Sequence, residues 1–94
     1  MGQTVVINNV VEMGDLLLID TDRSFTGQDG AAITPSDPGD AVPGKLGRRL
    51  FEVDLGIDYV YVLQNAVTVR RPGGWDEEAK AAALGAVEGF LLFY

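Results

Sequence analysis

The sequence contains neither cysteine nor histidine. The absence of cysteine excludes disulfides, thiol nucleophiles and the ligation of an iron–sulfur cluster through thiolates, and the two absences together remove the usual zinc ligands. Histidine is also the one side chain whose ordinary pKa lies near neutrality, so acid–base catalysis would fall to a perturbed carboxylate, lysine or tyrosine. The commonest components of an enzyme active site are therefore missing.

Long hydrophobic runs and widespread positive charge are also absent. No segment approaches the ~18 apolar residues that cross a bilayer, and no basic region precedes the apolar run at 5–7, so we expect a cytoplasmic protein. The net charge of −7 argues against nonspecific binding to nucleic acid or to an anionic membrane. Five of the seven cations lie between residues 45 and 71, where they form either a local basic patch or ordinary solvated charges.

The length and composition suit one small domain. Ninety-four residues, 47% of them hydrophobic, can bury a single core, whereas two cores would leave each half below the size that folds unaided. We therefore expect one domain spanning residues 1–94.

Four β-rich runs form two predicted hairpins. The first consists of residues 4–12 and 16–19, joined by a turn, and its two asparagines are typical of a bend or a bulge. The second consists of residues 59–63 and 66–69, joined by Gln64-Asn65, where asparagine tolerates the positive φ of a tight turn.

Two further segments have helical spacing. Residues 45–53 place apolar side chains on one face, and Gly56 follows where a left-handed residue would end the helix. Residues 76–92 begin at the natural N-cap Asp76. The stripe predicted to be buried on this helix comprises Ala79, Ala83, Val87, Phe90 and Leu91. The expected fold is α+β: a two-layer ββαββα domain with an antiparallel four-stranded sheet and both helices on one face.

The second hairpin provides the candidate site. A two-residue loop pairs Leu63 with Ala66, which places the valines on one face and the remaining side chains on the other. The face turned away from the helices would then carry Tyr59, Tyr61, Thr68 and Arg70. Tyrosine beside arginine is favoured at protein interfaces, although such a face also occurs without a partner. The basic edge of the first helix, Arg48 and Arg49, is a second candidate contact.

Carboxylates offer an alternative of another class. Asp20 and Asp22, with Asp29 nearby, could present oxygen ligands to a hard cation or a small ligand, but the spacing is not that of a calcium loop and also suits turns. A structural homo-oligomer is the third alternative.

Most of the chain resembles the N-terminal domain of the NifU-like (Nfu) iron–sulfur scaffold proteins. The resemblance is carried by GKLGRRLFEVDLGIDYVYVLQNAVTVRR at 44–71, by Trp75 opening the last helix, and by the segment 22–27 after the first strands. Arg48 to Glu52 match the helix of that family, Gly56 its glycine, and Val67 to Val69 its second strand. The chain departs from the family in its N-terminal signature, in the inserted Leu55, and in Ala66, where the family has an aromatic residue.

The resemblance implies a noncatalytic domain, without a cofactor, linked to iron–sulfur cluster assembly or delivery. The family holds its cluster on a separate domain with a C-x-x-C pair, which this chain lacks. Its implied partners are proteins of cluster assembly or recipients of clusters, with a homodimer as a further arrangement, and neither nucleic acid nor membrane is implied.

Overall fold

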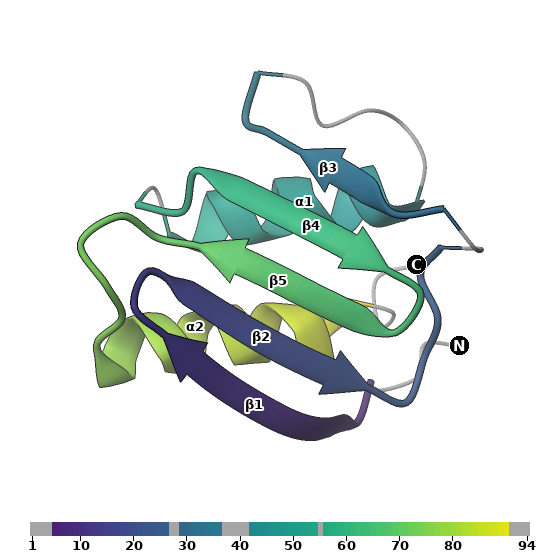
Figure 1. The fold of residues 1–94 in the computed structure, drawn as a ribbon, viewed down its shortest axis with the longest axis horizontal. Helices are drawn as coiled ribbons and strands as arrows, with labels where there is room; N and C mark the ends of the chain where they lie inside the picture. Colours follow the sequence, from purple (N-terminus) through teal and green to yellow (C-terminus); the bar gives the residue numbers. More distant parts are fainter. Residues whose placement is uncertain (1–4, 27–28, 37–41, 55, 91–94) are drawn as a thin grey trace.

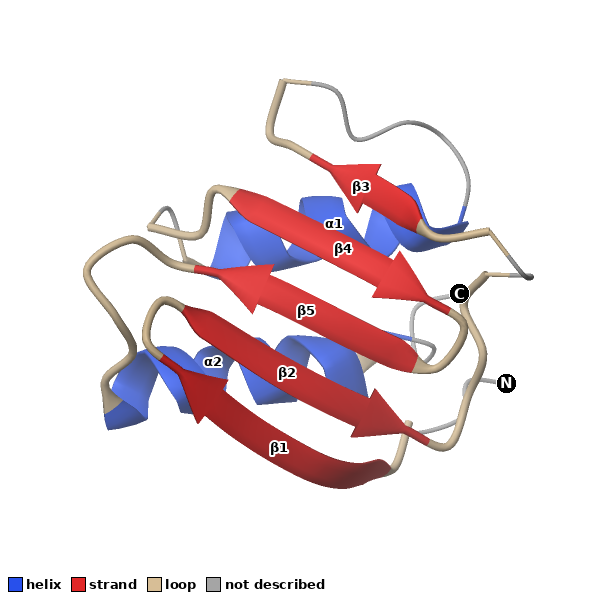
Figure 2. Ribbon diagram, viewed as in Figure 1, coloured by secondary structure: helices blue, strands red, loops and turns tan. Residues whose placement is uncertain are grey.

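The computed structural model describes residues 5–26, 29–36, 42–54 and 56–90. Its helices and strands are, in chain order, β1 (Ile7–Met13), β2 (Leu16–Thr21), β3 (Ala31–Ile33), α1 (Val42–Val53), β4 (Tyr59–Leu63), β5 (Ala66–Arg70) and α2 (Glu77–Glu88). Both helices lie against the same face of one sheet, which leaves the opposite face uncovered by any described element (Figures 1 and 2).

The sheet has five strands in the order β1-β2-β5-β4-β3, and every neighbouring pair is antiparallel. The predicted four-stranded ββαββα sheet is therefore wrong by one strand, although the α+β class holds. The missed strand, β3, is only three residues long, and its alanines have low β-propensity. It forms because Ile33 pairs with Val60 of β4, far along the chain, and buries its side chain in the core.

The first hairpin contains the expected irregularity. Met13 pairs with Leu16 across the turn at Gly14-Asp15, and the register shifts between Ile7 and Asn9. Asn8 is the extra residue of a β-bulge. The regular part of the β1 ladder consequently begins at Asn9.

The second hairpin has the predicted register, with Leu63 opposite Ala66 and Val60 opposite Val69. The residue with positive φ in its turn is Gln64, at 53°, and not Asn65. The expected loop length was right, but the left-handed residue was assigned one position too late. A positive φ at the first central residue alone is the pattern of a type II′ turn.

The segment after β2 holds the tip of the second hairpin. The Thr21 amide donates to the Asn65 carbonyl at 3.0 Å, and the Asn65 side-chain amide donates to the Thr21 carbonyl at 2.9 Å. The Phe25 amide donates to the Gln64 carbonyl at 2.8 Å. Thr21 is a buried polar residue whose hydroxyl donates to the Arg23 carbonyl, so its burial leaves no polar group unsatisfied.

Both helices differ from prediction at their ends. α1 begins at Val42, before the predicted Lys45, and ends at Val53. The predicted left-handed cap at Gly56 is wrong, because Gly56 does not have a positive φ and instead donates its amide to the Asp54 carboxylate at 2.8 Å. α2 is capped as predicted, since the Asp76 side chain accepts a hydrogen bond from the Ala79 amide, but the helix ends at Glu88.

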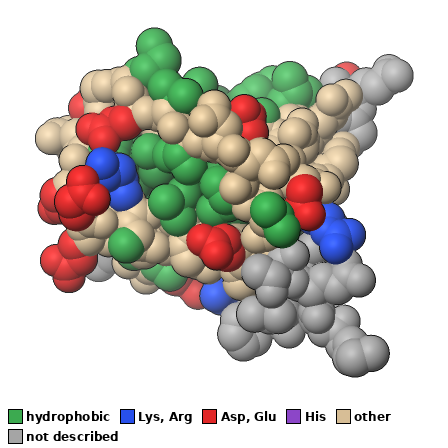
Figure 3. All heavy atoms as spheres, turned by 90° about the horizontal axis from the view of Figure 1, so that it is seen from below, with side chains coloured by type: hydrophobic (Ala, Val, Ile, Leu, Met, Phe, Trp, Pro, Cys, Tyr) green, Lys and Arg blue, Asp and Glu red, His purple; other side chains and the backbone are tan. Residues whose placement is uncertain are grey.

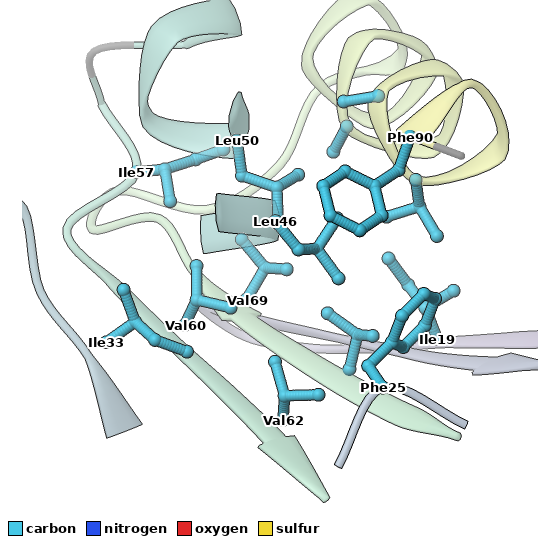
Figure 4. Packing of buried hydrophobic residues seen from close by; sticks show 14 of the residues in the cluster. Ile19, Phe25, Ile33, Leu46, Leu50, Ile57, Val60, Val62, Val69 and Phe90 are labelled. Atoms are coloured by element: carbon cyan, nitrogen blue, oxygen red, sulfur yellow. The ribbon is translucent and has the colours of Figure 1, made fainter. Parts of the chain in front are cut away.

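The core fills the space between the helices and the sheet (Figure 4). Leu46 and Leu50 of α1 and Val60 of β4 are fully buried. Phe25 and Phe90 close one end of the core, with ring centroids 6.0 Å apart in an edge-to-face arrangement. Four members of the predicted α2 stripe, Ala79, Ala83, Val87 and Phe90, are buried, and the fifth, Leu91, lies outside the described residues.

Within the described ranges, neither helix combines the length and the hydropathy needed to cross a membrane.

Candidate partner-binding face

The uncovered side of the sheet, which we call the open face, arises from the alternation of side chains along each strand. In β4 and β5 the four valines are fully buried beneath the helices. The intervening residues therefore point away from the core. The predicted quartet, Tyr59, Tyr61, Thr68 and Arg70, lies together on this face.

Tyr59 and Arg70 form a small charged and aromatic cluster with Asp58. The two residues are directly opposite in the ladder, and the guanidinium carbon lies 5.2 Å from the centre of the tyrosine ring, within the range of a cation–π contact. Arg70 also donates two hydrogen bonds to Asp58, from Nε to Oδ1 at 2.8 Å and from Nη2 to Oδ2 at 3.2 Å. The hydrogen bond and charge of Asp58 raise the pKa of Arg70. Asp58 and Tyr59 thus hold the guanidinium of Arg70 in place, and Asp58 balances its charge.

Tyr61 lies near the middle of the open face, opposite Thr68 on one side and Ala32 on the other. Its ring passes so close to Gly30 that a Cβ there would overlap the ring and its hydroxyl. The side chain remains 37% exposed. The missing side chain at Gly30 therefore makes room for Tyr61 while leaving part of its ring accessible.

The open face extends beyond the predicted quartet onto β1 and β2. The register places Val11, Leu18, Thr68, Tyr61 and Ala32 in one row that crosses all five strands. Val11 is 42% exposed and Met13 is 59% exposed, so two large apolar side chains lie side by side at the β1 end of this face. Sequence reasoning missed these positions, although the unbroken apolar run Leu16–Ile19 already indicated a strand that is apolar on both sides.

Arg48 and Arg49 do not join this face, because both belong to α1, in the other layer. Arg49 is half-buried, and its Nε donates to the Ala86 carbonyl of α2 at 3.1 Å. It therefore links the two helices. Arg48 is exposed on the helix layer. The predicted quartet and the predicted arginines of α1 therefore lie on opposite layers of the domain.

The carboxylates of the alternative hypothesis have structural roles or lie apart. Asp22 accepts a hydrogen bond from the Val6 amide at 2.9 Å, and Asp20 is an exposed strand residue opposite Ala66. Across residues 5–26, 29–36, 42–54 and 56–90, no three carboxylates gather in a way that could hold a metal ion. The described part of the chain gives this alternative no support.

A shallow depression of about 210 Å³ lies between the end of α1 and the start of α2. Much of its polar lining is already engaged, since Arg71 pairs with Asp54 at 2.9 Å and donates to the Gly74 carbonyl at 2.8 Å. Asp76 caps α2. These groups hold the connection between β5 and α2, and their hydrogen-bonding capacity is largely taken up by it.

Comparison with known proteins identifies a similar fold. No family model matches the chain, and no curated protein matches it. Among solved structures, the crystal structure of protein SAV1430 from Staphylococcus aureus, a structural-genomics target, superimposes with a TM-score of 0.63. The match covers 89% of this chain and 95% of that one, at 17% sequence identity. At this identity the similarity establishes a shared fold alone, and the resemblance to the Nfu domain stays a prediction.

Proposed function

We propose that the chain is a noncatalytic protein-interaction module that contacts a partner through the open face of its sheet. The observation that carries this proposal is the row of side chains that crosses the open face from Val11 to Ala32 and includes Tyr61, with exposed Met13 beside its β1 end. Contiguous exposed apolar side chains are one mark of a protein interaction site. Tyrosine and arginine are also the residues most often found at binding hot spots.

The proposed partner is a protein of iron–sulfur cluster assembly, and this part rests on the resemblance to the Nfu N-terminal domain. The chain has no cysteine, so a cluster would be held by another protein. The module would dock onto that protein or onto a recipient of its cluster. The positioned Arg70 and Tyr59 would supply orientation, and the apolar row would supply most of the binding free energy.

Isothermal titration calorimetry against a purified NifU-like domain with a C-x-x-C pair, from the same organism, tests the proposal. The face variant is Tyr61→Ala with Arg70→Ala, and the matched control is Arg48→Ala, which removes an exposed cation from the other layer. A hot-spot loss of ~2 kcal/mol would weaken binding about 30-fold in the face variant. Binding by the control should equal that of the wild type.

Two outcomes would contradict the proposal. Equal binding by the face variant and the wild type, with melting curves showing that both are folded, would rule out the open face. Absence of binding by the wild type up to about 100 µM would rule out this class of partner.

A further inference from the structure

β1 forms an unprotected edge of the sheet. It occupies one end of the strand order, and no described element lies beyond it. Met13 and Leu16 flank a two-residue turn, so their backbone groups bond to each other. The direction of the backbone N–H and C=O groups alternates along a strand, so those of Val11 also point to β2. The hydrogen bond from the Arg71 amide to the Asp15 carbonyl, at 2.9 Å, agrees with this, because it turns Asp15 towards β5 and the next residue, Leu16, towards β1. The backbone N–H and C=O groups of Val10 and Glu12 therefore point outward.

The two edges of the sheet differ in how they avoid further pairing. The β3 edge is three residues long and is followed by Pro35, both of which discourage an additional strand. β1 is seven residues long and contains neither proline nor lysine. Its protective features are the bulge at Asn8 and the single charge of Glu12, and Asn9–Met13 stays regular. This regular stretch, which we call the β1 edge, can accept another strand.

Apolar side chains flank the β1 edge on both sides. Val11 and Met13 are exposed on the open-face side. On the helix side, Val10 and Leu84 are partly buried against the core. Figure 3, which views the molecule from the β1 side, shows hydrophobic side chains gathered in the middle of this surface with charged side chains around them. An added strand would gain apolar contacts together with its backbone hydrogen bonds.

The negative charge at the β1 edge is partly offset by a lysine. Two copies of a chain with a net charge of −7 repel one another in general. The only charged residue of the edge, however, is Glu12, which pairs with Lys80 of α2 at 3.0 Å. Hydrogen bonds to Glu12 and to Glu77 raise the pKa of Lys80, so the lysine stays protonated opposite Glu12. Lys80 also pairs with Glu77 at 3.1 Å, so it offsets part of the negative charge at this edge and reduces the repulsion that a second copy would meet.

We propose that the β1 edge binds the β1 edge of a second copy, antiparallel, with Val11 on the two-fold axis. The regular stretch Asn9–Met13 has Val11 at its centre. In this register the outward backbone groups of Val10 form hydrogen bonds with those of Glu12 in the second copy. By symmetry, Glu12 of the first copy bonds to Val10 of the second. The two sheets become one continuous sheet, and the two open faces lie next to each other.

Single cysteines test this register directly, because the chain has none of its own. The two copies of Val11 would form a non-hydrogen-bonded pair with Cα atoms about 4.5 Å apart, within the range that a disulfide spans. Met13 lies on the same strand and the same face and is more exposed, but the two copies of Met13 would be roughly 13 Å apart along the strand. Val11→Cys should therefore form a disulfide dimer at least tenfold faster than Met13→Cys under mild oxidation.

Sedimentation of the cysteine-free wild type from about 5 µM to about 200 µM should show a concentration-dependent monomer–dimer equilibrium. Val11→Lys, which places like charges together on the axis, should be monomeric and folded. Val53→Lys, at an equally exposed valine of α1 outside the open face, should dimerise like the wild type.

Three results would overturn the proposal. The first is a wild type that is monomeric throughout that concentration range. The second is cross-linking through Cys at position 13 as fast as at position 11, which would exclude the register. The third is faster cross-linking of Leu63→Cys, on the open face near the other end of the sheet, which would indicate that two faces stack and that the edges do not pair.

Discussion

The two helices have the same length but pack against the sheet in different ways. Both contain 12 residues and both have an internal glycine. α1 buries large side chains, among them Leu46 and Leu50, whereas the buried residues of α2 are three alanines and one valine. One core is therefore lined by bulky side chains from one helix and by small side chains from the other.

The internal glycines of the two helices also differ in their surroundings. A Cβ on Gly47 of α1 would lie 2.6 Å from Cγ2 of Ile33 in β3, closer than such atoms can pack. A Cβ on Gly85 of α2 would meet nothing within 4 Å. Gly47 is thus required by the contact between α1 and β3, whereas Gly85 is merely tolerated. The same residue type in the middle of a helix has a packing role in one case and none in the other.

The largest expected effect comes from removing bulk from α1. Leu50→Ala leaves a cavity in the centre of the core and should lower the free energy of unfolding by about 3 kcal/mol. Val53→Ala, at a 42% exposed position of the same helix, should change it by less than ~0.5 kcal/mol. Urea denaturation of both variants checks the pair. Equal losses would mean that α1 does not depend on its buried leucines.

Adding bulk to α2 should have the next largest effect. Ala83 is completely buried, so Ala83→Leu must displace its neighbours and should lower the free energy of unfolding by about 2 kcal/mol. The exposed Ala81 is the control, and Ala81→Leu should be nearly neutral. Denaturation midpoints measure both, and an Ala83→Leu variant as stable as the wild type would show spare space beneath α2.

Gly47→Ala should destabilise the protein, because the new methyl group overlaps Ile33. The cost of overpacking exceeds the ~1 kcal/mol gained from a better helix former, leaving a net loss of about 1 kcal/mol. A double-mutant cycle with Ile33→Ala identifies the cause, since the effects of the two changes should not add. Additive effects would place the origin of the loss elsewhere.

Gly85→Ala should do the opposite. The position is exposed and helical, and the new methyl group would meet no other atom within 4 Å. Alanine should therefore raise the free energy of unfolding by about 0.8 kcal/mol through helix propensity. For a domain of this size the melting temperature should rise by roughly 4 °C, measured by calorimetry. A lower melting temperature would indicate a constraint on Gly85 that its surroundings do not show.

Local signals in the sequence predicted much of this architecture. Asp76 marked the start of α2, because the side chain of an N-cap residue accepts a hydrogen bond from the amide only three positions later. The register of the second hairpin followed from its two-residue loop, and that register placed the candidate quartet on one face. Predictions of this kind need only neighbouring residues.

The features that escaped prediction depend on distant parts of the chain. β3 exists because Ile33 meets Val60 and packs against Gly47, and neither contact is visible in the sequence Ala31–Ile33 itself. The extension of the open face to Val11 and Met13 became visible only when the strand order joined β1 to β2 and β2 to β5. Likewise, Arg49 is separated from the candidate face because α1 packs on the other side of the sheet, where Arg49 bonds to Ala86 of α2.

The hydrogen bonds between Thr21, Phe25 and the Gln64-Asn65 turn have a practical consequence. A hairpin tip is ordinarily where a chain accepts a peptide tag or a fluorophore with little disturbance. Here such an insertion would detach the tip from the end of β2 and the segment that follows it. Slow amide exchange at Phe25 would then report the opening of the whole domain and not the fraying of one loop.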